Sequence, residues 1–214
     1  MLIHDWDSAR SEAEWREWLA SRECFGVLAV DHPAPGEAPI MVPTHFTLSD
    51  NQILLHLHKQ NTAIDALRRS GSASLTVFGD YAYVPGYWRN PVDVEPERGV
   101  PTSYYAALNF RCTARLVDDP AGIARVLTAQ MVHMQPEGIH VPVTPESQPY
   151  GPMLSAVAGV ILEIREVEAK FKYDDHKSEA HRNRVSENLI ERGRPLDEAA
   201  AKQQQRRLGE SGEA

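Results

Sequence analysis

The feature of this sequence that most limits its fold is a series of β-type stretches that follow one another without an alternating strand–helix–strand rhythm. The stretches expected to form strands cover residues 24–30, 38–48, 51–58, 72–79, 81–88, 102–117 and 158–173. Neither of the glycine-rich phosphate loops GxGxxG and GxxxxGK(S/T) occurs. Helices inserted between antiparallel neighbours are typical of an α+β barrel rather than of a doubly wound sheet. We therefore predict a barrel of about six or seven mainly antiparallel strands with flanking helices.

Helices are expected at four places. Residues 11–21 form an amphipathic pattern in which Ser11 and Glu14 have capping-box spacing. Gly71 is a stop signal for a short helix at 63–70, and Pro120 suits the first turn of a third helix. A closing helix is expected at 178–193.

These elements suggest three parts. Residues 1–22 are predicted to form a helix packed on the barrel, residues 23–192 the barrel, and residues 193–214 a frayed helix or a disordered tail. The last part is low in large apolar residues, which leaves it little surface to bury. Residues 135–152 contain five prolines and are expected to form a long irregular connection.

The charge balance limits the partners of the chain. It has 30 acidic against 22 basic residues and a net charge of −8. Binding to a nucleic-acid backbone normally uses a basic surface, so direct DNA binding is expected to be weak. Residues 181–194 and 206–210 are the candidates for a local basic patch, and a solvated helix face is the alternative interpretation.

A cytoplasmic location is expected. Cys24 and Cys112 lie in apolar β-like stretches without CxxC spacing, which is typical of reduced core cysteines in an intracellular protein. The first residues lack the apolar segment of a signal peptide. The longest mostly apolar run, residues 153–162, is far shorter than the roughly 18 residues that a membrane helix needs.

Residues 56–65, HLHKQNTAID, end a strand in a way that suits an anion. Lys59 follows the strand, Asn61 or Thr62 can cap the next helix, and Asp65 has capping-box spacing from Thr62. A helix N-terminus beside a lysine and polar side chains can bind phosphate. An ordinary strand–helix junction with a solvated lysine is the alternative.

Two histidines in the same stretch raise the question of a metal. His56 and His58 are two residues apart on a strand and therefore share a face. A zinc site needs at least a third ligand. The spacing of His45, His133 and His140 is not that of metal ligands, so no metal site is predicted.

Four segments share the spacing of motifs that occur together in one family. In order, LHLHKQN (55–61) is similar to GHxARAN, FGDYAYVPGYWRN (78–90) to FxGPxAYISPxWY, VPTSYYAALNFRCTARLVDDP (100–120) to VPTWNYxxVxxxGxxxxxxDD, and VEAKFKYDDHKSEAHRNRVSENL (167–189) to IxGKxKLSQNxxxxDRxxVxxxL. The chain thus resembles the PaiB-type transcriptional regulators, roughly over residues 25–192.

This resemblance implies an FMN-binding split β-barrel, related to pyridoxamine-phosphate oxidases and flavin reductases. In that class the strand before the short helix brings the cofactor phosphate to the helix start, and the preceding strand lies beside the ribityl chain or flavin ring. The residues that the resemblance suggests for the cofactor are Thr44, His45, His58, Lys59, Asn61, Thr62, Tyr83, Thr102 and Lys170. For the last three, the alternatives are core packing, a strand hydrogen bond and an exposed strand face, respectively.

The chain also departs from the family pattern. Ser103 and Tyr104 stand where the family has Trp-Asn, residues 174–176 replace Ser-Gln-Asn, and Ala169 replaces a glycine. A divergent member is expected to keep the flavin site more readily than a partner or an activity.

Three functional hypotheses follow. The first is an FMN-binding flavoprotein of the PaiB type, a negative transcriptional regulator. The second is a flavin-dependent oxidoreductase that acts on a small molecule, and the third is a barrel that binds haem or a deazaflavin. No residue stands out as a general acid or base, although His45 and His58 could donate a proton, and flavin redox chemistry does not require one. A homodimer is expected because the cofactor groove of this class lies between two barrels.

Overall fold

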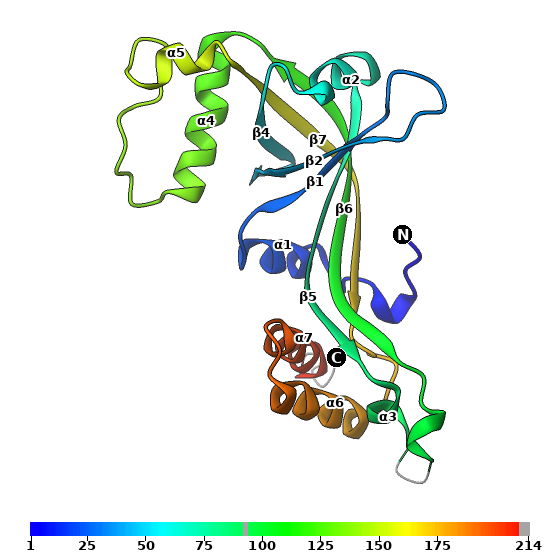
Figure 1. The fold of residues 1–214 in the computed structure, drawn as a ribbon. Helices are drawn as coiled ribbons and strands as arrows, with labels where there is room; N and C mark the ends of the chain where they lie inside the picture. The colour runs from blue at the N-terminus through cyan, green and yellow to red at the C-terminus, as the bar shows by residue number, and fades with distance from the viewer. Residues whose placement is uncertain (92–93, 210–214) are drawn as a thin grey trace. The chain divides into compact units, whose positions relative to one another are not determined.

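The computed structural model describes residues 1–91 and 94–209. Its strands are β1 (Phe25–Val30), β2 (Ile40–His45), β3 (Thr47–Ser49), β4 (Gln52–His58), β5 (Ser72–Val84), β6 (Thr102–Val117) and β7 (Val157–Lys172) (Figure 1). They form one sheet in the order β2-β1-β5-β6-β7-β4-β3. The pairings β1–β2, β1–β5, β3–β4 and β4–β7 are antiparallel. The predicted class, an α+β fold of antiparallel strands with flanking helices, is confirmed.

The helices are α1 (Glu12–Ala20), α2 (Thr62–Ser70), α3 (Gly86–Arg89), α4 (Pro120–Met134), α5 (Tyr150–Leu154), α6 (Glu179–Arg192) and α7 (Asp197–Gly209), with short 3-10 helices at Asp5–Asp7 and Pro96–Arg98. Gly71 ends α2 in the left-handed region at φ 61°, and Pro120 opens α4, as predicted. The one-turn helices α3 and α5 lie where an extended segment and an irregular connection, respectively, were expected. The expected loop 89–101 includes residues 92–93, which lie outside the described residues.

The predicted hairpin 38–58 is more complex than the sequence suggests. Only β3 pairs with β4, whereas β2 pairs with β1. Phe46, between β2 and β3, is fully buried, and its backbone N–H donates to the carbonyl of Cys24. The chain therefore changes its strand partner at a buried aromatic residue, as strands do at the corner of a barrel.

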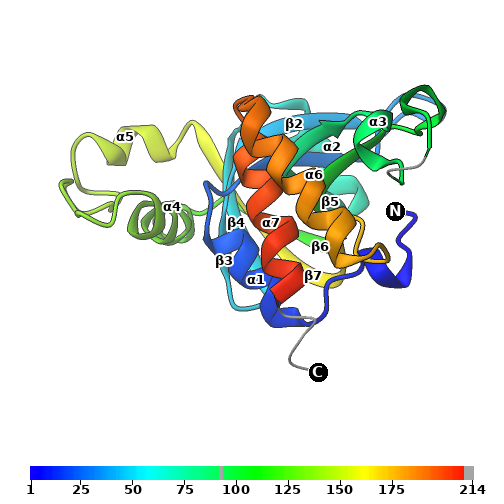
Figure 2. The same cartoon turned by 90° about the horizontal axis from the view of Figure 1, so that it is seen from below.

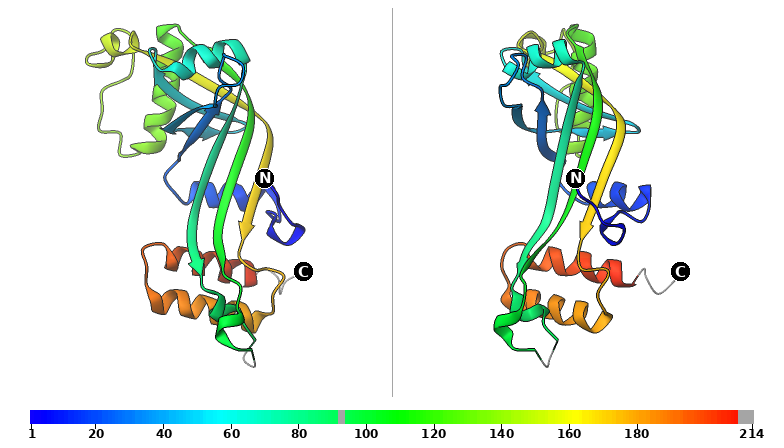
Figure 3. Two further views of the ribbon diagram at one scale, coloured as in Figure 1. Left: turned by 45° about the vertical axis from the view of Figure 1, so that its right-hand side comes forward. Right: turned by 90° about the vertical axis from the view of Figure 1, so that its right-hand side faces the viewer.

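The chain divides into two compact units. The first comprises Met1–Glu17, Phe78–Leu108 and Glu168–Ala214, and the second comprises Trp18–Val77 and Asn109–Val167. In the first unit α6 and α7 run side by side, in every view of the ribbon (Figure 2 and Figure 3). The N-terminal segment lies along β7, where Ser8 forms a bridge with Lys170.

Helix α7 lies within the segment for which a frayed helix or a disordered tail was expected. Ala200, Ala201, Gln204 and Arg207 are buried, so one face of this helix is part of the packed structure. Its buried face consists of small and polar residues, so the low content of large apolar residues in this segment does not indicate that it is exposed. Residues 210–214 of the predicted tail lie outside the described residues.

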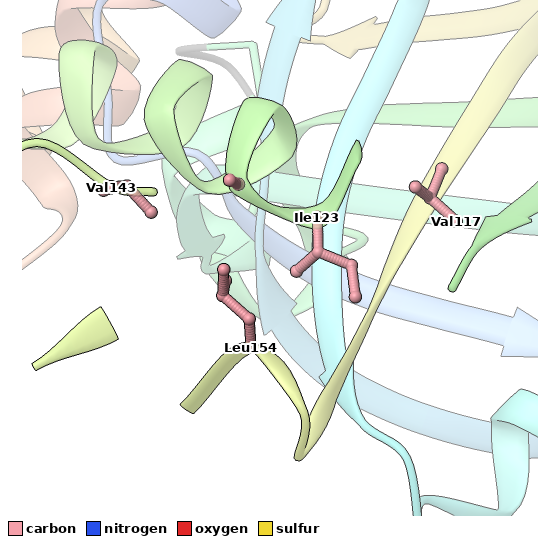
Figure 4. Packing of buried hydrophobic residues seen from close by; sticks show 5 residues of the cluster. Val117, Ile123, Val143 and Leu154 are labelled. Atoms are coloured by element: carbon pink, nitrogen blue, oxygen red, sulfur yellow. The ribbon is translucent and has the colours of Figure 1, made fainter. Parts of the chain in front are cut away.

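The second unit has a small apolar core beneath α4. Val117, Ile123, Ala124, Val143 and Leu154 pack together, and they come from the end of β6, from α4, from the proline-rich segment and from α5 (Figure 4). The proline-rich connection is therefore anchored at Val143. Both cysteines are free and buried, as predicted, and burial raises the pKa of the Cys112 thiol to about 12.

Within residues 1–91 and 94–209, the structure contains no helix of the length and apolar character needed to cross a membrane.

Candidate functional site

The β4–α2 junction brings several of the predicted residues together in the second unit. The amide of Asn61 donates to the carbonyl of His58, and this turn leads directly into α2. The side chain of Asn61 then accepts from the backbone N–H of Ala63 at 3.0 Å, so Asn61 is the helix cap. Thr62 is the first helical residue and not the cap. Its predicted capping box with Asp65 is therefore absent.

The junction exposes a positive end. Lys59 and Thr62 are exposed, and within the described parts of the chain the Lys59 ammonium makes no hydrogen bond or ion pair. At the helix start the backbone N–H of Ala63 donates to the side chain of Asn61 and that of Ile64 donates to its carbonyl, and this end carries the partial positive charge of the helix dipole. This arrangement can receive an anion such as a phosphate, because the Lys59 ammonium and the positive end of the helix dipole lie at one place.

Thr44 and His45 end strand β2. Thr44 is buried, and its hydroxyl donates to the backbone carbonyl of the next residue, His45, at 3.1 Å. His45 is exposed and its ring lies 5.3 Å from that of His56, centroid to centroid, at an interplanar angle of 65°. The structure thus joins His45 with His56. His58 is exposed, and its Nδ1 accepts from the amide of Gln60.

His56 is held by a residue that the sequence did not single out. Its Nδ1 lies 2.7 Å from Oε1 of Gln130 in α4. An amide oxygen only accepts, so His56 Nδ1 carries the proton and donates it. Gln130 is 3% exposed, and its Nε2 has no partner among the described residues. A polar residue on the buried face of an otherwise apolar helix was the signal in the sequence that could have identified it.

A glycine brings α4 close enough for this contact. Gly159 in β7 is paired with His56, and a Cβ at Gly159 would lie 3.2 Å from Cγ2 of Val126. Val126 and Gln130 are four residues apart on α4 and therefore lie on one face. The close approach of α4 at Gly159 thus places Gln130 over His56.

The same environment affects His45. Although the side chain is exposed, partial loss of its hydration lowers the pKa of the imidazole, and the nearby charge of His56 lowers it further. Because the usual pKa of histidine is about 6.5, His45 is mainly neutral at neutral pH. A neutral imidazole can both donate and accept a hydrogen bond.

The remaining predicted residues belong to the first unit. The ring of Tyr83 is 44% exposed, so it is not a core residue. Thr102 accepts a hydrogen bond from Lys172 Nζ at 2.8 Å. Lys170 is buried rather than on an exposed strand face: its Nζ donates to the carbonyl of Leu2 at 2.7 Å and lies 3.9 Å from Asp7.

A second polar centre in the first unit surrounds Asp174, one of the departures from the family pattern. Its carboxylate receives Nε and Nη2 of Arg89, the hydroxyl of Tyr104 and Nε2 of His181, each at 3.1 Å. Burial opposes ionisation of Asp174, but the bond from His181 and the charge and bonds of Arg89 lower its pKa to about 2. The group is therefore a structural anion that binds α3, β6 and α6 together.

Asp175, the next residue, anchors the two C-terminal helices. It accepts from Arg182 of α6 at 3.2 Å and from Arg207 of α7 at 2.8 Å. Arg207 is 1% exposed and also pairs with Glu14. These ion pairs explain how α7 is held without large apolar residues.

No metal centre accompanies these sites: in the part of the chain that the structure describes, no group of three or more His, Cys, Asp or Glu side chains could hold a metal ion.

Comparison with known proteins gives one family and several related folds. A family model described as "Putative FMN-binding domain" matches residues 1–166. No curated protein matches the chain. The flavocytochrome Anf3 from Azotobacter vinelandii is 16% identical with a TM-score of 0.61, over 80% of this chain and 72% of that chain.

Two further solved structures have similar folds. The FAD and heme binding protein from Mycobacterium smegmatis is 15% identical with a TM-score of 0.55, over 77% of this chain and 73% of that chain. The conserved hypothetical protein Rv2991 from Mycobacterium tuberculosis is 20% identical with a TM-score of 0.55, over 80% of this chain and 90% of that chain. At these identities the likeness concerns the fold, which is that of split-barrel flavoproteins. The family match confirms FMN as the cofactor predicted from the sequence.

Proposed function

The chain belongs to the FMN-binding domain family, and from this premise we propose that it binds the FMN phosphate at the β4–α2 junction and uses the flavin for redox chemistry on a small molecule. When bound, FMN supplies the electron transfer. The side chains of this protein supply binding, orientation and protons.

The observation that carries the proposal is the ammonium of Lys59, which has no hydrogen-bond or ion-pair partner among the described residues and lies beside the start of α2. The junction suits a phosphate, because Lys59 offers a full positive charge and the helix start adds the partial positive charge of its dipole. Asn61 has a different task, since its side-chain oxygen is used to cap the helix. The residues at the junction therefore fit the phosphate of FMN.

His45 is the best-placed group for proton transfer at this end of the barrel. It is exposed, mainly neutral and next to His56, whose orientation Gln130 fixes. General acid–base catalysis needs a titratable group, and a neutral imidazole can accept a proton. This favours an oxidoreductase over a protein that only stores flavin.

A transcriptional regulator of the PaiB type is the second candidate, favoured by the four motif resemblances. Direct DNA binding through α6 and α7 has little support, because most of their arginines are used internally. Arg182, Arg192, Arg206 and Arg207 pair with carboxylates, and Arg184 donates to two backbone carbonyls. A regulatory role would therefore act through the flavin or a protein partner.

The haem alternative gains little from the histidine pair. With metal–nitrogen bonds of about 2.0–2.1 Å, two imidazoles on opposite sides of one iron have centroids roughly 6 Å apart. The rings of His45 and His56 are 5.3 Å apart and edge to face. This pair does not fit both axial positions of one haem.

The proposal includes a homodimer in the cytoplasm. Tyr104 and Phe110 are buried within their own chain, but Phe78 and Tyr87 are 68% and 60% exposed. Exposed aromatic rings of this kind are enriched at protein interfaces. The free, buried cysteines suit a reducing compartment. Light scattering of the FMN-bound protein at micromolar concentration tests the dimer, and a monomer would exclude it.

The test of the cofactor is a titration of the purified protein with FMN, haem and a deazaflavin, followed by visible absorbance and tryptophan fluorescence. We expect FMN to bind at micromolar concentration or tighter and to keep its flavin spectrum after removal of free ligand. Turnover is then tested by flavin reduction with a nicotinamide donor. A protein that leaves its fluorescence unchanged with FMN, or that retains only haem, would refute the proposal.

A further inference from the structure

A pocket in the first unit is lined by the C-terminal end of β5 and by the turn between α6 and α7. Its volume is about 270 Å³. The residues that line it are Tyr81, Ala82, Tyr83, Arg192, Arg194, Pro195, Leu196 and Asp197. All of them belong to one compact unit.

The lining carries one positive charge in excess. Arg192 and Asp197 neutralise each other through two bonds, at 2.6 and 2.7 Å, and Asp197 is buried. Arg194 is exposed, and within residues 1–91 and 94–209 its guanidinium makes no hydrogen bond or ion pair. Two arginines against one aspartate leave a net charge of +1, located at Arg194.

The rest of the lining is apolar or aromatic. Tyr81, Tyr83 and Leu196 are 48%, 44% and 49% exposed. Neither phenol hydroxyl has a hydrogen-bond partner among the described residues. Large side chains of this kind stay exposed at a cost unless a ligand or partner covers them, and ligand pockets combine apolar walls with a few polar groups.

We propose that this pocket binds a small planar aromatic monoanion, of which an arylcarboxylate is the simplest example. The ring would lie against Tyr81, Tyr83 and Leu196, because aromatic pairs and apolar burial favour a flat ligand. The carboxylate would pair with Arg194, whose planar guanidinium matches a carboxylate in two-point geometry. An anion without a ring would bury too little surface, and a ring without a charge would leave Arg194 unpaired.

The assignment goes beyond the proposed phosphate site, because none of the pocket's residues belongs to the β4–α2 junction, although the family resemblance also suggested Tyr83 for the cofactor. FMN also combines a flat ring system with an anionic group, so the experiment must separate a second ligand from the cofactor itself. The flavin-free protein makes this possible, since it tests the pocket whether or not FMN binds elsewhere.

The experiment is a titration of the flavin-free protein with benzoate, benzyl alcohol and acetate. The readout is the methyl resonance of Leu196 in NMR spectra, with affinities checked by calorimetry. Arg194→Gln removes the charge, and Tyr83→Ala removes one wall. Lys202→Gln is the matched control, because it removes one exposed positive charge from α7 and does not line the pocket.

We expect benzoate to shift the Leu196 methyl resonance and to bind at least about tenfold more tightly than benzyl alcohol or acetate. Arg194→Gln should weaken benzoate about tenfold, the loss of roughly one charge-assisted contact, and leave benzyl alcohol unchanged. Tyr83→Ala should weaken both ring ligands. Lys202→Gln should match the wild type.

Equal affinity for benzoate and benzyl alcohol, or an unchanged benzoate affinity in Arg194→Gln, would overturn the proposal. A competition arm adds FMN. If FMN displaces benzoate and Arg194→Gln weakens both ligands in parallel, the pocket belongs to the cofactor and the separate ligand is excluded. Benzoate binding that FMN leaves unchanged supports the proposal, and a failure of FMN to bind would count only against the cofactor proposal.

Discussion

The hydroxyl of Tyr104 donates to Oδ2 of Asp174 at 3.1 Å, and both residues are buried although 70 positions separate them. Burial raises the pKa of the Tyr104 phenol, and the charge of Asp174 raises it further, so the phenol stays protonated and remains a donor. Gln204 of α7 donates to the same phenol oxygen at 2.8 Å. Tyr104 thus links Asp174, which follows β7, to helix α7.

The stability of the protein should fall in acid through Asp174. The pKa of Asp174 is about 2 in the folded state, against 3.8 for an aspartate side chain in water. A depressed folded pKa adds stability above pH 3.8, which is lost as the pH falls toward 2, and the difference corresponds to roughly 2 kcal/mol. Urea unfolding between pH 6 and about pH 2 measures it.

Asp174→Asn should be less stable at pH 7 and should lose this part of the acid dependence. Asp65→Asn is the control, because Asp65 makes an exposed ion pair with Arg68. If wild type and Asp174→Asn lose stability in parallel as the pH falls, the charge of Asp174 does not contribute as described.

Glu14 should contribute far more to the free energy of unfolding than Glu12, although both lie in α1. Glu14 is buried and pairs with Arg207, whose side chain is 1% exposed, whereas Glu12 makes an exposed pair with Arg16. Glu14→Ala removes one of the two carboxylates that pair with the buried Arg207, Asp175 being the other, and should cost about 1.5–3 kcal/mol, the range for a hydrogen bond to a charged group. Glu12→Ala should cost about 1 kcal/mol or less. Equal midpoints of thermal unfolding for the two variants would contradict the ion-pair argument.

The phosphate role of Lys59 is testable with two ligands. A charge-assisted contact is worth about 1.5–3 kcal/mol, so Lys59→Ala should weaken FMN by roughly 10- to 100-fold. Riboflavin lacks the phosphate and should bind as before. Thr62→Ala should also weaken FMN but not riboflavin, by a smaller factor than Lys59→Ala.

Lys177→Ala is the control for Lys59, because it removes an exposed lysine of the first unit. Fluorescence titrations with both flavins distinguish the outcomes. A parallel loss of both affinities would indicate a damaged barrel, and unchanged FMN affinity in Lys59→Ala would remove this lysine from the site.

The pKa of His45 should depend on the charge of the neighbouring His56. Burial is the larger cause of its lowered pKa and the charge of His56 the smaller. His56→Gln removes only the second cause, so the pKa of His45 should rise while remaining below the usual value of about 6.5. NMR titration of the His45 ring protons in the flavin-free protein measures this. A further fall of the pKa would show that His56 does not act on His45 through its charge.

The sequence by itself determined the elements that local physics controls. The alternation and β-type residues of β4 and β6, Pro120 at the start of α4 and Gly71 at the end of α2 each act within a few residues. Such signals do not depend on distant contacts. The four motif segments also carried the FMN assignment, because their spacing along the chain is itself sequence information.

Only the tertiary structure decided which polar groups meet. His56 is held by Gln130 across 74 positions, and Glu14 meets Arg207 across 193. In the sequence, Gln130 is one polar residue of a helix and Arg207 one of several arginines near the end. Their burial, and therefore their importance, depends on which surface each helix packs against.

The same reason explains two features that the sequence did not indicate, the buried face of α7 and the change of strand partner at Phe46. The expected tail lacks large apolar residues, but Arg182 and Arg207 hold it through Asp175. The change of strand partner after β2 follows from the burial of Phe46. Ion pairs and strand partners form between segments that are distant in sequence, and their free energy depends on shared burial. A local pattern determines what each segment can form, whereas packing determines which neighbour it meets.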